Sequence, residues 1–446
     1  MRFAEWADRI RHSLWFVPTL FTVASAIAAL LLVWVSSETD ARVTELPLLF
    51  SAGVDGARAM LQAIAGSIIT VAGVVFSITI VALQLTSTQF SPRVLRNFLR
   101  DRSTQLVLGA FMGTFTYSLL VLRSIRSEDE STAAFVPVFA ISGALLLTLF
   151  SLGMLIYFIH HISVRIQVTS IVASVAGDTL ATLERLRRRW RADEDRSWNP
   201  AAAQAEPTVP PSGGIPIADV GASEAALKGP ESGYLQFVSI ETLVTAARER
   251  NGRIRMLIAP GMWLQEGVAC AAFEGDGTAE VDYPGLQGAL SKAIGVGHER
   301  SMSEDVAFGI QQLVDIAIKA LSPSVNDPTT AMNCVDRLMQ ILIDAGSAPD
   351  SPRSFTDAEG AVRLEVPFPN FDNLCDLSFD QIRHYGQAAP AVVIHLARAL
   401  SVLRTLPEAR HPVLRRHARL LADAAESLAP EYERRRALEA IGPLLP

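Results

Sequence analysis

The sequence predicts an α-helical integral membrane protein with four transmembrane helices, followed by a mixed α/β and then mainly α-helical cytoplasmic region. Three observations lead to this fold class. Four long uncharged stretches lie in the first 160 residues, charged residues make up only 19% of the 446-residue chain, and hydrophobic residues make up 50%. Soluble domains carry about 25% charged residues, so the deficit of charge itself indicates membrane segments.

Each uncharged stretch is long enough to cross a bilayer as a helix, for which about 20 apolar residues suffice. Because no Asp, Glu, Lys or Arg lies inside any stretch, a proton relay or charge-coupled transport within the membrane is disfavoured. The first stretch is long for the apolar part of a signal peptide and no cleavage site follows it, so we expect it to be retained. The four stretches are Leu14–Val35, Met60–Thr86, Ser103–Leu122 and Thr132–Ile159.

The charges between the stretches predict the topology. Basic connections alternate with acidic ones, beginning with Arg2, Arg9 and Arg11 ahead of the first stretch. The positive-inside rule then places both termini in the cytoplasm. The three scattered cysteines agree with a reducing compartment, because they are too few for a disulfide framework. The basic second connection begins at Ser91-Pro92, and it is either a short amphipathic helix at the membrane surface or a plain loop.

The second stretch carries a regular pattern of polar residues. Ser67, Thr70, Ser77 and Gln84 recur at intervals of three and seven, which places them on one stripe of a helix. Polar side chains in a membrane favour a protein interior or a water-filled path. The stripe is therefore either the lining of a pore or a packing seam at which small residues let helices approach. Both readings place it in the interior of an oligomer.

The third stretch contains a GxxxG motif, formed by Gly109 and Gly113. Two glycines about one helical turn apart allow close contact between helix backbones. The motif therefore predicts helix packing, either within one chain or between subunits.

The composition of the chain predicts its further organisation. The four-helix membrane domain spans residues 1–160, and a helical run over 161–192 leaves the membrane. A stretch rich in Pro, Ala and Gly over 193–233 predicts a linker. Residues 234–285 alternate between strand-like and helical patterns, which predicts a small β-α-β-β module. Residues 286–446 are predicted to be mainly helical.

Two consecutive helices are predicted after the small module. Ser301 and Glu304 have the spacing of a capping box, which predicts the start of the first helix. Asp327 followed by Pro328 starts the second, with the Asp327 carboxylate as its cap. A tight helix-loop-helix explains most of this pattern. The polar residues that remain candidates for a cytoplasmic site are Asp305, Asp315, Asn326 and Asp327.

Four stretches of the chain carry a resemblance to known proteins. They are GVVFSITIVALQLTSTQFSPR (73–93), DRSTQLVLGAFMGTFTYSL (101–119), SGYLQFV (232–238) and DVAFGIQQLVDIAIKALSPSVNDPTTA (305–331). These stretches resemble a family of bacterial predicted membrane proteins classed as a domain of unknown function. The resemblance implies four N-terminal transmembrane helices in a bacterial inner membrane, and it implies no particular reaction. Where the family usually has Arg and Gly, this chain has Gln311 and Ser324.

The search for chemistry limits the functions to be considered. The sequence contains no GxxxxGK[ST], GxGxxG, HExxH, CxxC or GxSxG motif, so we expect no enzymatic activity, no cofactor and no metal. An acidic pI of about 5.7 argues against nucleic acid as a partner. The expected partners are the lipid bilayer, further copies of the chain and a small ion or ligand.

Two main function classes remain after this search. The first is an oligomeric ion channel or permeation pathway, lined by the second stretch and gated by the cytoplasmic domain. The second is a membrane-anchored sensor or scaffold without a pore. An enzyme with an unrecognised site is a third alternative.

Overall fold

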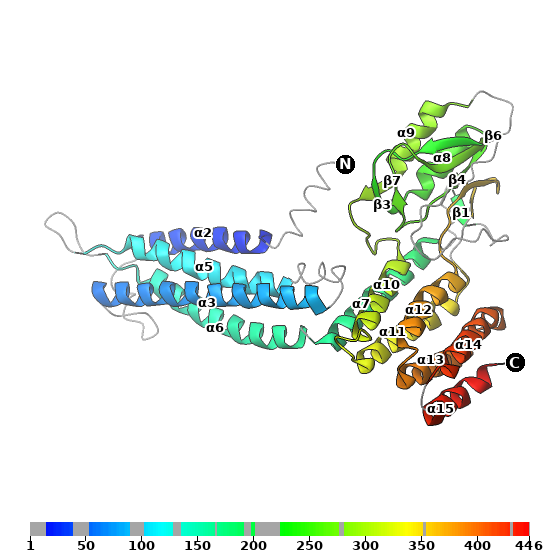
Figure 1. Ribbon diagram of the computed structural model, residues 1–446. Helices are drawn as coiled ribbons and strands as arrows, with labels where there is room; N and C mark the ends of the chain where they lie inside the picture. Colours follow the sequence, from blue (N-terminus) through cyan, green and yellow to red (C-terminus); the bar gives the residue numbers. More distant parts are fainter. Residues whose placement is uncertain are drawn as a thin grey trace. The chain divides into compact units, whose positions relative to one another are not determined.

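The computed structural model divides into two compact units, Met1–Ser170 and Ile171–Pro446, which are described separately (Figure 1). The basic segment that begins at Ser91-Pro92 lies outside the residues that the structure describes. The described residues are 15–38, 53–89, 102–127, 135–165, 167–190, 198–200, 224–275, 281–350, 354–428 and 431–445.

The first unit is a bundle of four long helices. All four have the length and hydropathy of membrane-spanning helices, so the prediction of four such helices is confirmed. The apolar window of α5 is 61% buried, against 11–28% in the other three, so α5 is the central helix of the bundle. The helices are α2 (Phe16–Glu38), α3 (Val54–Gln89), α5 (Arg102–Ser124) and α6 (Val138–Arg165).

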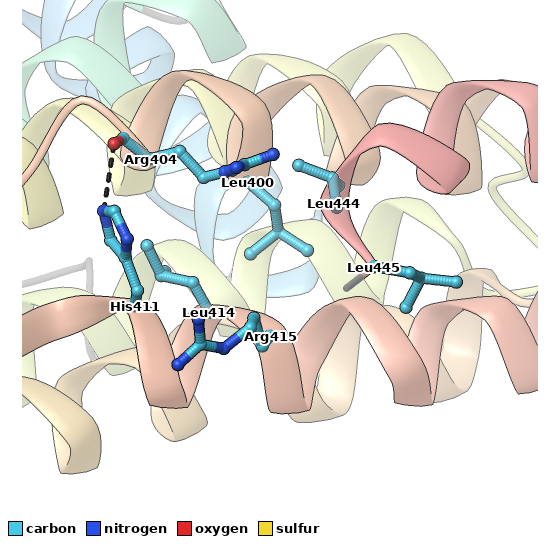
Figure 2. Close-up of a pocket in the computed structure, with 7 residues that line it drawn as sticks. All are labelled: Leu400, Arg404, His411, Leu414, Arg415, Leu444 and Leu445. Atoms are coloured by element: carbon cyan, nitrogen blue, oxygen red, sulfur yellow. Dashed lines mark hydrogen bonds between the residues drawn. The ribbon is translucent and has the colours of Figure 1, made fainter. Parts of the chain in front are cut away.

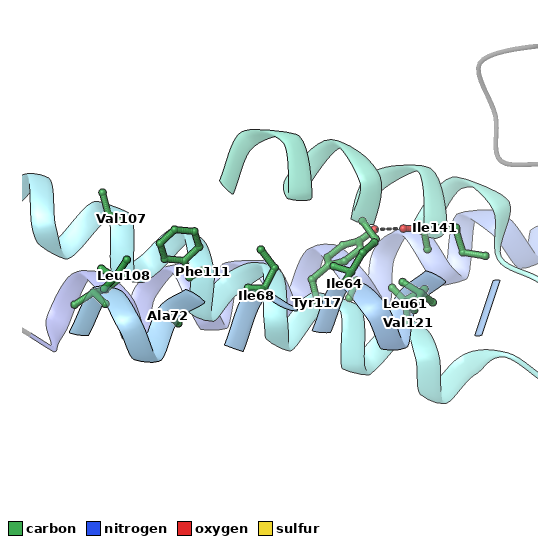
Figure 3. Close-up of a cluster of buried hydrophobic side chains, with 14 of the residues drawn as sticks. Leu61, Ile64, Ile68, Ala72, Val107, Leu108, Phe111, Tyr117, Val121 and Ile141 are labelled. Carbon is green, nitrogen blue, oxygen red and sulfur yellow. Dashed lines mark hydrogen bonds between the residues drawn. The ribbon is translucent and has the colours of Figure 1, made fainter. Parts of the chain in front are cut away.

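The centre of the bundle is filled by large side chains. Phe111 and Tyr117 of α5 are buried among apolar residues of α3 and α6 (Figure 3). The hydroxyl of Tyr117 donates to the carbonyl of Ala140 at 2.8 Å, and the hydroxyls of Thr114 and Ser151 lie 2.8 Å apart. Burying a hydroxyl is costly unless it is hydrogen-bonded. These pairs therefore let α5, which has several polar residues, occupy the middle of an apolar bundle.

The GxxxG motif brings α5 close to α2. A Cβ added at Gly109 would lie 3.1 Å from Cγ of Phe21, and one at Gly113 would lie 2.6 Å from the hydroxyl of Ser25. The small residues are thus required for the approach of these two helices, as the motif predicts. Of the two readings, packing within one chain and packing between subunits, the structure places the glycines in the first.

The described residues of the second unit form two β-sheets. The larger has the strand order β1-β8-β9-β4-β6-β2, and the smaller has the order β5-β3-β7. Neighbouring strands are antiparallel except β4 and β9, where Ile254 pairs with Leu364 in parallel. The strands are β1 (Trp198–Pro200), β2 (Ala225–Lys228), β3 (Gly233–Val238), β4 (Gly252–Met256), β5 (Trp263–Leu264), β6 (Ala269–Gly275), β7 (Ile294–Gly297), β8 (Ser354–Asp357) and β9 (Val362–Glu365).

The predicted β-α-β-β order is present as β3, α8 (Ile240–Glu249), β4 and β6, but these strands do not form one module. Strand β3 belongs to the smaller sheet, while β4 and β6 belong to the larger. The larger sheet also takes β1 and β2 from the predicted linker 193–233 and β8 and β9 from the predicted helical region. Short strands acquire their stability from partners far away in sequence, which a local pattern does not reveal.

The remaining helices of the second unit follow the sequence closely. Helix α8 packs against β4 and α9, and α10 packs against α11 and α12. All three cysteines of the chain are buried and free. The helices are α7 (Val168–Trp190), α9 (Tyr283–Ala293), α10 (Val306–Ala320), α11 (Pro328–Gly346), α12 (Phe371–Gly386), α13 (Pro390–Leu403), α14 (His411–Glu426) and α15 (Glu431–Ile441), with 3₁₀ turns η2 (Glu408–Arg410) and η3 (Gly442–Leu444).

The two predicted helix starts have different outcomes. Asp327 caps α11, and its carboxylate accepts a hydrogen bond from the N–H of Thr330 at 3.1 Å, so that prediction is confirmed. The predicted capping box from Ser301 is wrong. Asp305 is the N-cap of α10, and the Glu304 side chain is used in a tertiary contact instead.

Candidate functional site

The four polar residues of the predicted stripe lie on the outside of the bundle. Ser67, Thr70, Ser77 and Gln84 are all exposed in the single chain. The residues through which α3 packs on the bundle are Leu61, Ile64, Ile68, Ala72 and Val75. At about 100° per residue, the polar stripe and this packing stripe are centred about 180° apart on the helix. The stripe therefore cannot line the interior of a single bundle.

The outward face of α3, defined by these four polar residues with Gly66 and Gly73, is open to close approach. A Cβ added at either glycine would meet nothing within 4 Å. The hydroxyl of Thr70 donates to the carbonyl of Gly66 at 2.8 Å, so this polar group is satisfied within its own helix. Val74 and Val81 are exposed within the face, and further apolar side chains, Ile69, Phe76, Ile78 and Ile80, are exposed along its borders.

The cytoplasmic candidate Asp305 has a structural role. Its side chain is 3% exposed, and it accepts hydrogen bonds from the N–H of Phe308 and from Nε of Arg300, each at 2.9 Å. Gly261, at a φ of 91°, leaves the space that the carboxylate occupies. Burial raises the pKa of Asp305, and the charge of Arg300 opposes this rise. The carboxylate is thus held between a helix N-terminus and an arginine.

The other cytoplasmic candidates do not gather around Asp305. Asp327 caps α11, whereas Asp305 caps the preceding helix α10. Helix α10 has 15 residues, so the two caps are separated by about 22 Å of helix. Asp315 lies in the middle of α10 and accepts a hydrogen bond from Gln311 at 2.8 Å. Asn326, at a φ of 48°, forms the turn before α11.

The sequence did not indicate the contact that Glu304 makes. The Glu304 carboxylate pairs with Arg189 of α7 and accepts a hydrogen bond from the N–H of Val238 in β3 at 3.0 Å. Arg189 also donates to the carbonyl of Val238 at 3.0 Å. Burial raises the pKa of Glu304, and the charge of Arg189 opposes this. This pair of a buried carboxylate and a half-buried arginine ties α7 to the smaller sheet, and nothing in the local sequence distinguishes Arg189 from the neighbouring arginines.

The described residues contain no group of three or more His, Cys, Asp or Glu side chains that is suited to a metal ion. Of the predicted site residues, only the α3 stripe forms one continuous surface. The α3 stripe and the membrane helices around it lie in the part of the chain that is similar to known proteins.

A family of predicted membrane proteins, DUF2254, matches residues 11–402. The chain belongs to this family. It is also 31% identical over 404 residues to uncharacterised proteins of Mycobacterium bovis and Mycobacterium tuberculosis, covering 89% of this chain and 72% of each relative. No solved structure matches the chain. Family membership and the four apolar helices together establish a membrane protein, as the resemblance of the sequence motifs implies.

Proposed function

We propose that the protein is a homo-oligomer of the bacterial inner membrane whose copies meet along the outward face of α3, and that this seam is a permeation pathway for small ions. The observation that carries the proposal is the position of Ser67, Thr70, Ser77 and Gln84 on the face opposite the packing stripe. Within the described part of the chain nothing covers this face, and a second copy presents the same small and polar residues to it.

The cost of exposing polar groups to lipid supports the oligomer. A hydroxyl such as that of Ser77 loses hydrogen-bonding water when it faces hydrocarbon. A neighbouring α3 helix restores polar surroundings, and Gly66 and Gly73 allow the two backbones to approach closely. The bordering apolar side chains would then mark the boundary between the seam and the lipid.

The packing of the bundle favours a pathway between copies over one within a chain. Phe111, Tyr117 and Leu61 are fully buried in the bundle, so the centre is filled with side chains. The seam instead offers hydroxyl and amide groups, which can replace part of the hydration shell of an ion. Since the spans carry no charged side chain, selectivity would depend on the width of the path and on these dipoles.

We place the second unit and both termini in the cytoplasm. There the second unit would gate the pathway. Helix α7 begins at Val168, directly after α6 ends at Arg165, so any movement of the second unit acts on α6 through a short connection. The ion pair between Arg189 and Glu304 fixes the far end of α7 within the second unit. A reporter fused after Leu46 should therefore behave as external, and one fused after Trp190 as cytoplasmic. The opposite behaviour at either position would refute this topology.

The second candidate is a membrane-anchored sensor or scaffold in which the seam is dry. The internal hydrogen bond of Thr70 favours this reading, because a hydroxyl that bonds to its own helix needs no water. The permeation pathway requires copies to meet at α3, whereas a sensor or scaffold needs its helices only as a membrane anchor.

One variant, Ser77→Leu, separates the two candidates when it is measured in two ways. If the seam is a wet path, ion flux into liposomes should fall while assembly in detergent is unchanged, because a bulky apolar group favours dewetting. If the seam is dry, assembly itself should weaken, because Leu does not fit where a small hydroxyl allowed close approach.

The matched control is Gly153→Leu, which adds the same side chain at an exposed position of α6 with open space around it. This control should change neither flux nor assembly. A wild-type protein that is strictly monomeric by mass in detergent and in lipid would contradict the permeation pathway and leave the sensor or scaffold.

A further inference from the structure

A small pocket lies in the second unit between the end of α13, the start of α14 and the turn η3 (Figure 2). Its volume is about 90 Å³. Six of its seven lining residues lie beyond residue 402, where the family match ends, so family membership does not describe it. The lining residues are Leu400, Arg404, His411, Leu414, Arg415, Leu444 and Leu445.

The lining of the pocket carries the side chains of two arginines and a histidine and no acidic side chain. Within the described residues, neither Arg404 nor Arg415 forms an ion pair. Nearby arginines of the same helical region do, since Arg410 pairs with Asp350 and Arg416 pairs with Asp376. Arg398 of α13 and Arg419 of α14 also form no ion pair among the described residues, so the pocket is distinguished by having two such guanidinium groups in one lining.

The hydrogen bonds of the lining residues leave donors available. Arg404 donates from Nη1 to the carbonyl of Pro443, which holds η3 in place. A guanidinium has five N–H donors, and within the described part of the chain only the carbonyl of Pro443 accepts from that of Arg404, so most of these donors can serve a ligand. Nε2 of His411 lies 3.1 Å from the carbonyl oxygen of Arg404 and 3.0 Å from that of Leu406. Because carbonyl oxygens only accept, Nε2 carries the proton and the ring orientation is fixed.

The rest of the pocket wall is apolar. Leu400, Leu414 and Leu444 are buried, and Leu445 is half-buried at the edge. Ligand sites typically combine such apolar walls with a few convergent polar groups. Here leucine and arginine side chains line the same small space from two helices, so a fitting ligand has an anionic head and a short aliphatic part (Figure 2).

We propose that this pocket binds a small carboxylate with a short aliphatic stem. The planar guanidinium fork matches the two oxygens of a carboxylate, and the leucines would contact the stem. The small volume excludes long acyl chains. This proposal does not rest on the permeation pathway, because the pocket lies wholly within the second unit.

The test uses the full-length protein in detergent and butyrate as the probe, with binding measured by titration calorimetry. Butyrate should bind, whereas 1-butanol, which lacks the charge, should not. Arg415→Gln should weaken butyrate binding about tenfold or more, because it removes a charge-assisted hydrogen bond. The matched control Arg398→Gln changes an exposed arginine of α13 that does not line the pocket, and it should leave the affinity unchanged.

Three outcomes would overturn the proposal. They are no binding of butyrate at millimolar concentration, equal weakening by Arg415→Gln and Arg398→Gln, and binding of inorganic phosphate as tight as that of butyrate. The last would mean that charge alone is recognised. Thermal melting of both variants checks that they fold, and Arg415 is preferred to Arg404 because Arg404 also holds η3 through Pro443.

Discussion

The outward faces of α3 and α6 differ although both helices belong to the same membrane bundle. The face of α6 carries large apolar side chains such as Leu146 and Ile156, which are 68% and 65% exposed. The outward face of α3 also exposes Val74 and Val81, but between them it carries small and polar residues such as Gly73 and Ser77. Lipid is a good solvent for the first kind of surface and a poor one for the second.

This difference shows that exposure in a single chain has two meanings in a membrane protein. An exposed leucine of α6 is already in its preferred surroundings once lipid is present. An exposed stripe of serine, threonine, glutamine and glycine becomes favourable only when another helix or water covers it. The contrast is why we propose a contact between copies at α3 and a lipid contact at α6.

Disulfide cross-linking tests most directly whether the outward faces of α3 and α6 differ in their contacts with other copies. Ser77→Cys should form a covalent dimer on oxidation in liposomes, and Leu149→Cys on the α6 face should not. The native cysteines should not interfere, because burial raises the pKa of Cys270 and of Cys334 to about 12 and holds the pKa of Cys375 well above its usual range. Equal cross-linking from both positions would show that the two faces are alike.

A pair of glycine substitutions sharpens the distinction between packing within a chain and packing between copies. Gly113→Leu should destabilise the bundle by about 1–3 kcal/mol, because the new side chain meets Ser25 of α2. Gly73→Leu meets no atom of its own chain, so it should leave the melting temperature of the monomer unchanged and weaken assembly instead. Melting of Gly73→Leu as low as that of Gly113→Leu would contradict the assignment of the α3 face.

A change in the second unit gives the smallest effect and serves as a control for general destabilisation. Asp327→Ala removes the cap of α11 and should lower stability by about 1 kcal/mol while leaving the oligomer intact. If assembly were lost with this variant, loss of assembly in the α3 variants could be a consequence of lower stability alone. Thermal melting and mass measurement of the same sample provide both readings.

The effect of Asp327→Ala should also depend on pH. Hydrogen bonds from the Thr330 hydroxyl and backbone N–H lower the pKa of Asp327 in the folded state. A lowered folded pKa contributes stability above the unfolded value of about 3.9, and the contribution is lost as pH falls through the folded pKa. The difference in melting temperature between wild type and variant should therefore be constant near neutral pH and shrink below about pH 4. A difference that grew on acidification would mean that the carboxylate is not the stabilising group.

Local signals in the sequence predicted much of this molecule. The four spans follow from uncharged length, the α11 cap follows from Asp327-Pro328, and the close packing at Gly109 and Gly113 follows from their spacing. Each of these three features depends on residues within a few helical turns of one another, so it can be predicted without knowing which distant segments pack together. The prediction from Ser301 was wrong because two adjacent acids compete there, and the tertiary contact of Glu304 leaves Asp305 to cap the helix.

The sequence by itself determined that the chain has four apolar helices and that α3 has a polar stripe, because hydropathy and helical period are properties of neighbouring residues. Only the tertiary structure decided that this stripe faces away from its own bundle, since that depends on how α3 packs against α5. It likewise decided the membership of the larger sheet, in which β1 and β8 pair across more than 150 residues. Contacts between distant segments are selected by the packing of the whole chain, and a local pattern does not contain that information.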